Sequence, residues 1–265
     1  MLIAQLSDLH LRREGDPAYV GIDTPACARA AVAAIAALDP APDCVLLTGD
    51  LTDGSHDEEF ALLRDLLRPL RMPCYLITGN HDEAGSLRRT FADHRYLGDS
   101  GPLNWVIDTH PLRLIAIDTV VPRASHGSLP TDTLVWLDRQ LAASARPTII
   151  VMHHPPFATG LAGMDAIGVR QGANELEAIV RRHPQIERLL CGHLHRTIFR
   201  RFGGSVVSVC PSTAHQITLD LQPDAAESYV LEPPGYQLHL WRDGEGLVTH
   251  HAVIGDYAGP FPFDD

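Results

Sequence analysis

The sequence lacks the features of a membrane protein and of a secreted, disulfide-bonded protein. Its longest apolar stretches, residues 26–38 and 148–152, are too short or too polar to cross a bilayer, which takes about 20 predominantly apolar residues. The first residues have neither a basic segment nor a cleavage site, and they predict a strand rather than a signal peptide. The five cysteines are widely spaced and form no Cys-x-x-Cys motif, which is typical of buried thiols in a reducing compartment. We therefore expect a cytoplasmic protein with no membrane partner.

Positive charge is also scarce. The chain of 265 residues has a formal net charge of −12, and its short basic runs, Arg181-Arg182 and Arg200-Arg201, are isolated pairs. Nucleic-acid polymers bind basic surfaces, so the sequence predicts no nucleic-acid partner. The hydrophobic fraction of 45% and the charged fraction of 20% are typical of a soluble globular protein.

Apolar, β-rich runs alternate with helical patterns along much of the chain. Strands are predicted at residues 2–7, 44–48, 74–78, 112–118, 148–153, 188–191, 205–210, 237–241 and 247–253. Four helices are predicted. The first spans residues 24–38, the second follows a capping box formed by Ser55 and Glu58, the third begins at about residue 131, and the fourth spans about residues 173–182. The alternation indicates the α/β class, and the strands that dominate after Cys191 indicate a second sheet. We predict a four-layer fold, a two-sheet β-sandwich flanked by helices.

The length suits one domain, which we expect to span residues 1–265. A Pro-rich, acidic segment at about residues 217–236 predicts an excursion from the core, either a lid or a contact surface. Homo-oligomerisation through this excursion is therefore one of our hypotheses.

Five short motifs contain carboxylate, amide and imidazole groups. They are Asp8-Leu9-His10, Gly49-Asp50, Gly79-Asn80-His81-Asp82, His153-His154-Pro155-Pro156 and Gly192-His193-Leu194-His195. Four of the five follow an apolar run that predicts a strand. In open α/β sheets, ligands bind beyond the carboxyl ends of the strands, so we expect these side chains to converge. They are enough ligands for two cations and too many for one, which predicts a dinuclear hydrolase.

Spacing indicates which side chains share an ion. Residues two apart on a strand point the same way, so Asp8 and His10 can reach one ion together. The same spacing relates His193 to His195, and paired imidazoles suit Zn, Fe, Mn or Co. Asp50, directly after a buried strand, is well placed to bridge two ions with its two oxygens.

Neighbouring residues on a strand face opposite sides, so we expect only one of His153 and His154 to be a ligand. We choose His154, which lies nearer the following prolines, and expect His153 to be a packed or supporting histidine. Asn80 is an unusual but neutral ligand. Asp82 can accept a hydrogen bond from His81 and orient its ring.

The ordered set of motifs resembles the calcineurin-like metallophosphoesterase superfamily. Within this superfamily, the chain is similar to the bacterial class III cyclic-nucleotide phosphodiesterases and the glycerophosphodiesterases. The similarity to this subgroup extends beyond the motifs, to residues 6–10, 19–24, 213–216 and 257–260. The resemblance implies one metal held by Asp8, His10 and His195, a second held by Asn80, His154 and His193, and Asp50 as the bridge. It also implies that His81 is not a ligand but contacts the phosphate or the leaving-group oxygen.

The implied activity is hydrolysis of a 3',5'-cyclic nucleotide or a glycerophosphodiester by in-line attack of metal-bound hydroxide. Two divalent ions, two aspartates and a hydroxide leave a site charge of roughly +1, which suits a singly charged diester. A phosphomonoesterase or nucleotide pyrophosphatase is the alternative, and a non-catalytic protein-binding module is a remote one. Substrate choice lies at the pocket rim, where Tyr19, Asp23 and His215 are candidates without assigned roles. We expect Arg196, after the last motif, to be solvated.

Overall fold

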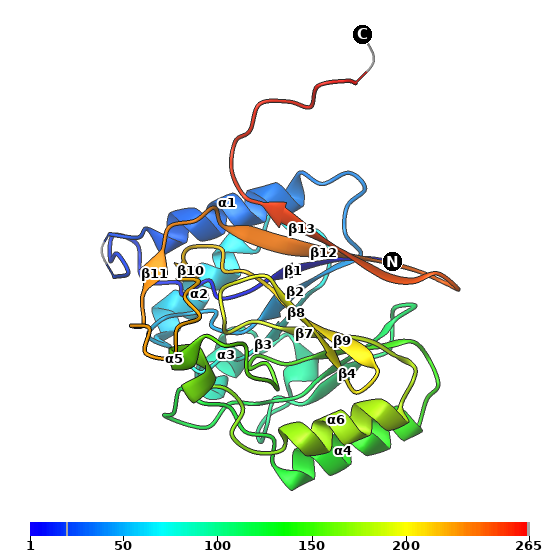
Figure 1. Ribbon diagram of the computed structural model, residues 1–265. Coiled ribbons are helices and arrows are strands. Elements are labelled where there is room, and N and C mark those ends of the chain that lie inside the picture. Colours follow the sequence, from blue (N-terminus) through cyan, green and yellow to red (C-terminus); the bar gives the residue numbers. More distant parts are fainter. Residues whose placement is uncertain (20, 264–265) are drawn as a thin grey trace.

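Two mixed β-sheets pack face to face, with helices outside each of them (Figure 1). The computed structural model describes residues 1–19 and 21–263. The first sheet has the order β13-β12-β1-β2-β3. Its strands are β1 (Leu2–Leu6), β2 (Cys44–Thr48), β3 (Cys74–Ile77), β12 (Gly235–Arg242) and β13 (Gly246–Val253). β1, β2 and β3 are parallel, whereas β12 and β13 add an antiparallel hairpin beside β1.

The second sheet has the order β4-β5-β6-β7-β9-β8. Its strands are β4 (Trp105–Ile107), β5 (Arg113–Ala116), β6 (Thr148–Val151), β7 (Ile186–Cys191), β8 (Ile198–Phe202) and β9 (Ser205–Val209). β5, β6, β7 and β9 are parallel, and an antiparallel strand lies at each edge. Each sheet therefore combines a group of adjacent parallel strands with antiparallel strands at one or both sides.

The helices form the two outer layers. α1 (Thr24–Ala36), α2 (Asp57–Leu66) and α3 (Ala84–Thr90) cover the first sheet, and α4 (Thr131–Ala142) and α6 (Ala173–Arg182) cover the second. Short elements complete the set, namely η1 (Arg95–Leu97), α5 (Ala162–Ala166), and the hairpin of β10 (Gln216–Ile217) and β11 (Tyr229–Val230). Among the described residues, no helix combines the length and the apolar character needed to cross a membrane.

Side-chain alternation divides the core into three layers. On β1, Ile3 faces the second sheet, while Ala4 and Leu6 face the helices. Because both faces of the central strands are buried, β2 is apolar almost throughout, as parallel strands usually are. The five cysteines are free thiols, three of them buried, as their spacing predicts.

The predicted four-layer fold is confirmed, and the local errors have physical causes. The capping box expected from Ser55 and Glu58 is wrong, because α2 begins at Asp57 and Glu59 accepts a hydrogen bond from the backbone of His56 (3.0 Å). The hydroxyl of Ser55 instead accepts from the backbone N–H of Glu83 (2.5 Å). The short strands β4, β8, β10 and β11 were not predicted.

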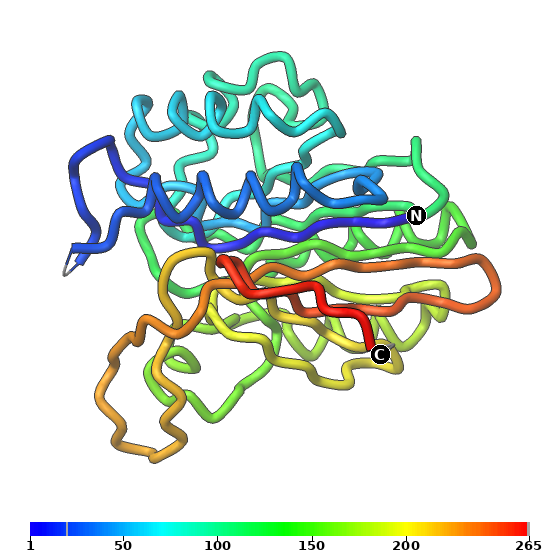
Figure 2. The backbone as a smooth tube through the Cα atoms, turned by 90° about the horizontal axis from the view of Figure 1, so that it is seen from above, coloured from blue at the N-terminus to red at the C-terminus, as the bar shows by residue number. Residues whose placement is uncertain are grey.

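The ends of the strands determine where a site can form. Figure 2 shows that the loop after β1 and the segment between β10 and β11 project at the same end of the molecule. This is the end at which β1 and β2 finish, so both loops border the carboxyl ends of the parallel strands.

Candidate metal centre

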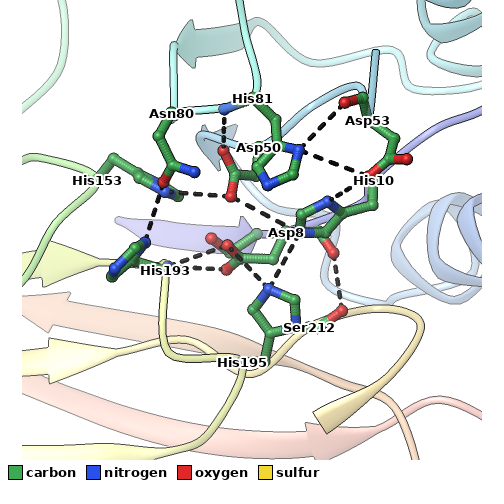
Figure 3. Close-up of polar contacts among 12 residues, drawn as sticks. Asp8, His10, Asp50, Asp53, Asn80, His81, His153, His193, His195 and Ser212 are labelled. Carbon is green, nitrogen blue, oxygen red and sulfur yellow. Dashed lines mark hydrogen bonds and ion pairs between the residues drawn. The ribbon is translucent and has the colours of Figure 1, made fainter. Parts of the chain in front are cut away.

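The five motifs meet at one end of the sandwich, each following a parallel strand (Figure 3). Asp8 and His10 follow β1, Asp50 follows β2, and Asn80 follows β3 in the first sheet. The histidine pair after β6 and the one after β7 come from the second sheet. The centre is therefore built across the two sheets, and its aspartates and histidines, apart from His81, are almost fully buried.

A strained backbone holds these side chains. Of the eight described non-glycine residues with positive φ, five belong to the motifs: Asp8 (52°), His10 (44°), Asp50 (45°), His193 (72°) and His195 (50°). The left-handed region is unfavourable for residues with a Cβ, and such strain persists where the surrounding structure imposes it, often at functional sites. The chain thus turns sharply after each strand to aim these groups inward.

One ligand group consists of Asp8, His10, Asp50 and His195, whose ligand atoms all lie within 4.8 Å of one another. The Nε2 atoms of His10 and His195 are 3.0 Å apart. His10 Nε2 lies 3.6 Å from Asp50 Oδ2, and His195 Nε2 lies 3.6 Å from Asp8 Oδ1. Two nitrogens and two carboxylate oxygens thus converge on one point.

The outer nitrogens of these two imidazoles are already used. His10 Nδ1 donates to Asp53 Oδ1 (3.2 Å), and His195 Nδ1 donates to the backbone oxygen of His215 (3.0 Å). A histidine that donates through one ring nitrogen presents the lone pair of the other, which is the usual arrangement of metal-binding histidines.

The second ligand group shares Asp50 and adds Asn80, His153 and His193. His193 Nδ1 lies 3.1 Å from Asn80 Oδ1, and His153 Nε2 lies 3.4 Å from Asp50 Oδ2. Within the described residues, the buried Nε2 atoms of His153 and His193 have no hydrogen-bond partner. Because an unpaired buried polar atom is costly, these two nitrogens indicate a ligand that the protein atoms do not supply.

The hydrogen bonds of the two adjacent histidines favour His153, rather than the expected His154, as the ligand. His153 Nδ1 donates to the backbone oxygen of Thr48 (2.8 Å), so its Nε2 faces Asp50. A ring nitrogen of His154 also comes within 4.8 Å of the cluster. However, the Thr119 hydroxyl donates to His154 Nδ1 (2.8 Å), and His154 Nε2 donates to the backbone oxygen of Ser125 (3.1 Å). Both nitrogens of His154 are thus occupied, and the geometry favours His153 as a ligand.

Asp50 connects the two groups through a single oxygen. Its Oδ2 lies between His10 and His153, whereas its Oδ1 accepts the backbone N–H of His81 (2.9 Å). This arrangement differs from the expectation that each of the two carboxylate oxygens of Asp50 faces one ion. The backbone bond to Oδ1 fixes the carboxylate and leaves Oδ2 as the shared atom.

The protonation states of His193 and His195 suit cation binding. Burial holds the pKa values of His193 and His195 well below the usual value, so both imidazoles are neutral at pH 7, the form that binds metals. Burial also raises the pKa of Asp8 to about 6, and the charge of Asp50 adds to this rise. Burial would raise the pKa of Asp50 as well, but the nearby His153 holds it well below its usual range. Cations would relieve the repulsion between these two buried carboxylates.

The donor set fits two transition-metal ions. It combines carboxylate, amide and imidazole groups without a thiolate, a set compatible with Mn, Fe, Co and Zn. The unpaired Nε2 atoms of His153 and His193, together with the shared Asp50, indicate two adjacent metal positions rather than one.

Asp53, rather than Asp82, contacts the ring of His81. Asp82 accepts the backbone N–H groups of Leu51 (2.9 Å), Gly79 (2.9 Å) and Thr52 (3.0 Å), so it fixes the loops after β2 and β3. The expectation that it orients His81 is therefore wrong. His81 Nδ1 instead donates to the backbone oxygen of Asp53 (3.1 Å) and lies 3.5 Å from its carboxylate.

Asp53 was missed because the sequence offers no signal for it beyond its place after Gly49-Asp50. Its carboxylate contacts His10 on one side and His81 on another, and it accepts from Arg12 Nε (2.8 Å). Arg12 also donates to the backbone oxygen of Pro17 (3.0 Å), which ties the loop after β1 to the centre. Asp53 is thus a positioning residue that contacts the metal-ligand candidate His10, the non-ligand His81 and, through Arg12, the loop after β1.

The rim of the centre is aromatic. The ring centroids of Tyr19 and His215 are 4.9 Å apart, those of Tyr19 and Tyr229 are 5.1 Å apart, and those of His215 and His195 are 4.6 Å apart. The three rim side chains border a pocket of about 220 Å³ between α5 and the segment from β10 to β11. An aromatic pocket therefore adjoins the centre through His215, whose ring contacts that of His195.

Two other rim candidates have structural roles. Asp23 caps α1 by accepting the backbone N–H of Ala26 (2.8 Å). Arg196 pairs with Glu232 (2.9 Å) and donates to the backbone oxygen of Ile217, and only 16% of its side chain is exposed. The expectation that Arg196 is solvated is therefore wrong, since it anchors the segment around β10.

Comparisons with known proteins extend over the whole chain. The family model described as calcineurin-like phosphoesterase matches residues 1–197. A probable glycerophosphodiester phosphodiesterase GpdQ from Arcobacter nitrofigilis is 35% identical, covering 99% of this chain and 97% of that protein. The 3',5'-cyclic adenosine monophosphate phosphodiesterase CpdA from Pseudomonas aeruginosa is 31% identical, covering 100% of this chain and 94% of that protein.

Solved structures share the fold at low sequence identity. A dimetal phosphatase from Danio rerio aligns with a TM-score of 0.65 at 14% identity, covering 96% of this chain and 99% of that chain. The purple acid phosphatase PPD1 from yellow lupin aligns with a TM-score of 0.69 at 13% identity, covering 95% of this chain and 51% of that chain. At these identities the likeness shows the fold alone.

The contacts of Asp53 predict its effect on metal binding. Asp53→Asn keeps the size of the side chain but removes the charge that holds His10, so metal affinity should fall about 10- to 100-fold. Titration of metal-stripped protein with Mn²⁺ measures this change. Asp57→Asn, which alters an exposed carboxylate on α2, is the matched control and should bind as the wild type does. Equal affinities of Asp53→Asn and the wild type would contradict the positioning role.

Proposed function

The chain belongs to the calcineurin-like phosphoesterase family, and we propose on that basis that it hydrolyses small phosphodiesters with two metal ions. The substrate classes are 3',5'-cyclic nucleotides and glycerophosphodiesters, which the names of its relatives indicate. The observation that carries the proposal is the pair of ligand groups that share Asp50, beside the aromatic pocket.

The geometry supports two ligand sets, which differ from the sequence expectation in one histidine. Asp8, His10 and His195 would hold one ion, Asn80, His153 and His193 would hold the other, and Asp50 would be shared. We propose Mn, Fe, Co or Zn as the metals. Such ions, when bound, would lower the pKa of water and neutralise charge developing on the phosphoryl oxygens.

His81 is the residue that we propose acts on the substrate. Its Nδ1 is held by the backbone oxygen of Asp53, its ring lies 4.6 Å from that of His10, and about a third of its side chain is exposed. In the imidazolium form, in which both ring nitrogens carry a proton, Nε2 can donate to a phosphoryl oxygen or to the leaving alkoxide. Asp53, rather than Asp82, orients the ring for this step.

The charges around the site favour a diester over a monoester. A monoester carries a second negative charge, which would require a free cationic side chain nearby. Arg12 is paired with Asp53 (2.8 Å) and Arg196 with Glu232 (2.9 Å), so neither cation is free to meet that charge. Phosphomonoester or pyrophosphate hydrolysis thus remains the second candidate function.

The aromatic pocket is the proposed place for the organic part of the substrate. Tyr19, His215 and Tyr229 border it, and the segment between β10 and β11 forms one of its walls. We propose that residues 1–265 act as one metallophosphoesterase domain whose excursion at about 217–236 shapes this pocket. We also propose a cytoplasmic location and no nucleic-acid partner, which the free thiols and the net charge of −12 support.

Turnover of two synthetic esters tests the activity. Protein loaded with Mn²⁺ should hydrolyse bis(p-nitrophenyl) phosphate at least about 10-fold faster than p-nitrophenyl phosphate, because Arg12 and Arg196 are already paired with carboxylates and do not meet the extra charge of the monoester. Metal-stripped protein should be inactive on both. A preference for the monoester would support the phosphatase alternative, and inactivity of the fully metal-loaded protein would support a binding module.

The two adjacent histidines provide a matched pair of variants. His153→Ala should bind one metal ion per chain instead of two and lose at least about 100-fold in turnover, because His153 supplies an inward nitrogen. His154→Ala removes a buried ring of the same size and should keep two ions while its melting temperature falls. Metal content by elemental analysis distinguishes them, and loss of metal from His154→Ala alone would restore the original assignment.

The role of His81 predicts a dependence on the leaving group. His81→Ala should lower turnover about 10²- to 10⁴-fold for a cyclic nucleotide, whose alkoxide must be protonated. The loss should be smaller for bis(p-nitrophenyl) phosphate, whose phenolate departs without a proton. His250→Ala, an exposed histidine on β13, is the control. An equal loss on both substrates would assign His81 to phosphoryl binding rather than to proton transfer.

A further inference from the structure

The segment between β10 and β11 leaves the sheets as a loop and returns to them. Residues 218–228 form this loop, which we call the wall loop because it borders the aromatic pocket together with α5 (Figures 1 and 2). The amide of Thr218 donates to the backbone oxygen of Ser228 (2.9 Å), and the hydroxyl of Ser228 donates to that of Thr218 (2.9 Å). These bonds hold the two sides of the loop together, but they do not attach it to the body of the molecule.

One side chain reaches both sides of the base of the wall loop. Arg196 donates to the backbone oxygen of Ile217, the last residue of β10. Its other terminal nitrogen lies 2.9 Å from Oε2 of Glu232, which lies two residues beyond the end of β11. The planar guanidinium of an arginine presents its donors as a rigid fork, so it can serve two acceptors at once. We call this arrangement the Arg196 clasp.

The clasp differs from the fully exposed ion pairs of the protein. The side chains of Arg196 and Glu232 are 16% and 46% exposed, whereas those of Arg242 and Glu245 in the turn between β12 and β13 are 64% and 67% exposed. Exposed pairs contribute little to stability, because water and salt screen them. A mostly buried guanidinium that loses its carboxylate is left with an uncompensated charge. Removing the charge of Glu232 should therefore disturb the base of the wall loop.

The clasp and the aromatic pocket share one wall. Ile217 pairs with Tyr229 in the ladder of β10 and β11, and both residues line the pocket. The ring centroid of Tyr229 lies 5.1 Å from that of Tyr19 and 5.4 Å from that of His215. Because packed side chains have little free space between them, a shift of Ile217 changes the position of the aromatic rim.

The wall loop also rests directly on α5. A Cβ on Gly163 of α5 would lie only 2.3 Å from Cγ of Glu227, so the two backbones approach closely there. A Cβ on Gly160, just before α5, would lie 3.4 Å from Cδ2 of Leu221. The wall loop is thus held at its base by the clasp and elsewhere by α5, and a displaced base changes the shape of the pocket between them.

We propose that Arg196 is a positioning residue for substrate selectivity, which fixes the pocket wall through Ile217 and Glu232 and so determines how well the organic part of a phosphodiester fits. This inference rests on the proposed function, which assigns the aromatic pocket to that part of the substrate. The side chain of Arg196 lines a hollow on the outer surface, beside Glu232, rather than the aromatic pocket. It therefore acts on the substrate through the wall and not by contact.

Steady-state kinetics of Glu232→Gln with bis(p-nitrophenyl) phosphate tests the proposal. KM should rise at least about 5-fold while kcat changes less than about 2-fold, because the variant loses binding and not the chemical step. The inhibition constant of inorganic phosphate, which has no organic part to enter the pocket, should stay within about 2-fold of the wild type. Glu245→Gln, which breaks the exposed pair with Arg242, is the control and should match the wild type.

Substitutions of the arginine provide a graded series. Arg196→Lys keeps the charge but not the fork that serves two acceptors, so its KM should lie between those of the wild type and Arg196→Gln. Arg196→Gln combined with Glu232→Gln should resemble Arg196→Gln alone, because without the guanidinium Glu232 no longer contributes to the clasp. All variants should keep the metal content of the wild type. A fall in kcat at unchanged KM, an equal rise in the phosphate inhibition constant, or additive effects of the two substitutions would overturn the proposal.

Hydrogen exchange separates this proposal from the proposed function, because it requires no substrate. The Thr218 amide, which closes the base of the wall loop, should exchange at least about 5-fold faster in Glu232→Gln than in the wild type, as read by mass spectrometry. Unchanged exchange would refute the clasp even in an active enzyme. Faster exchange with an unchanged KM would refute the role in selectivity. A wild type inactive on diesters would refute the proposed function and the selectivity with it, while faster exchange would still support the clasp.

Discussion

The burial of Asp50 between two imidazoles is the interaction on which the rest of the centre depends. A carboxylate removed from water requires compensating charge and hydrogen bonds. His10 and His153 face its Oδ2, and the backbone of His81 binds its Oδ1. These three partners come from the ends of β1, β6 and β3, so one side chain fixes the relative positions of both sheets at this end. The fold and the site therefore share a single constraint.

This constraint explains the strain and the close packing around it. Asp50 has a φ of 45° and is preceded by Gly49 with a φ of 93°, so the chain reverses directly after β2. A Cβ on Gly79 would overlap both the backbone and the carboxylate of Asp50. Such contacts cost free energy, and buried strands on both sides offset it. Metal binding would add to that compensation, because it supplies charge that the protein atoms lack.

The sequence predicts the groups of this centre better than their orientations. The spacing of Asp8 and His10 correctly brings them together, although β1 ends at Leu6 and positive φ values, rather than strand alternation, aim both side chains. Alternation indicates that one histidine after β6 faces inward. Which one depends on the tertiary partners of each ring, and sequence spacing does not reveal these. The positioning role of Asp53 was missed for the same reason.

The segment between β10 and β11 links the pocket to the outer surface. Tyr229 and Ile217 border the aromatic pocket, whereas Leu219 and Leu221 line a hollow on the outer surface. Arg196, directly after the motif that contains His195, holds both ends of this segment, because it donates to the backbone oxygen of Ile217 and pairs with Glu232. The motif that supplies a histidine to the centre is therefore followed at once by the residue that fixes the wall of the neighbouring pocket.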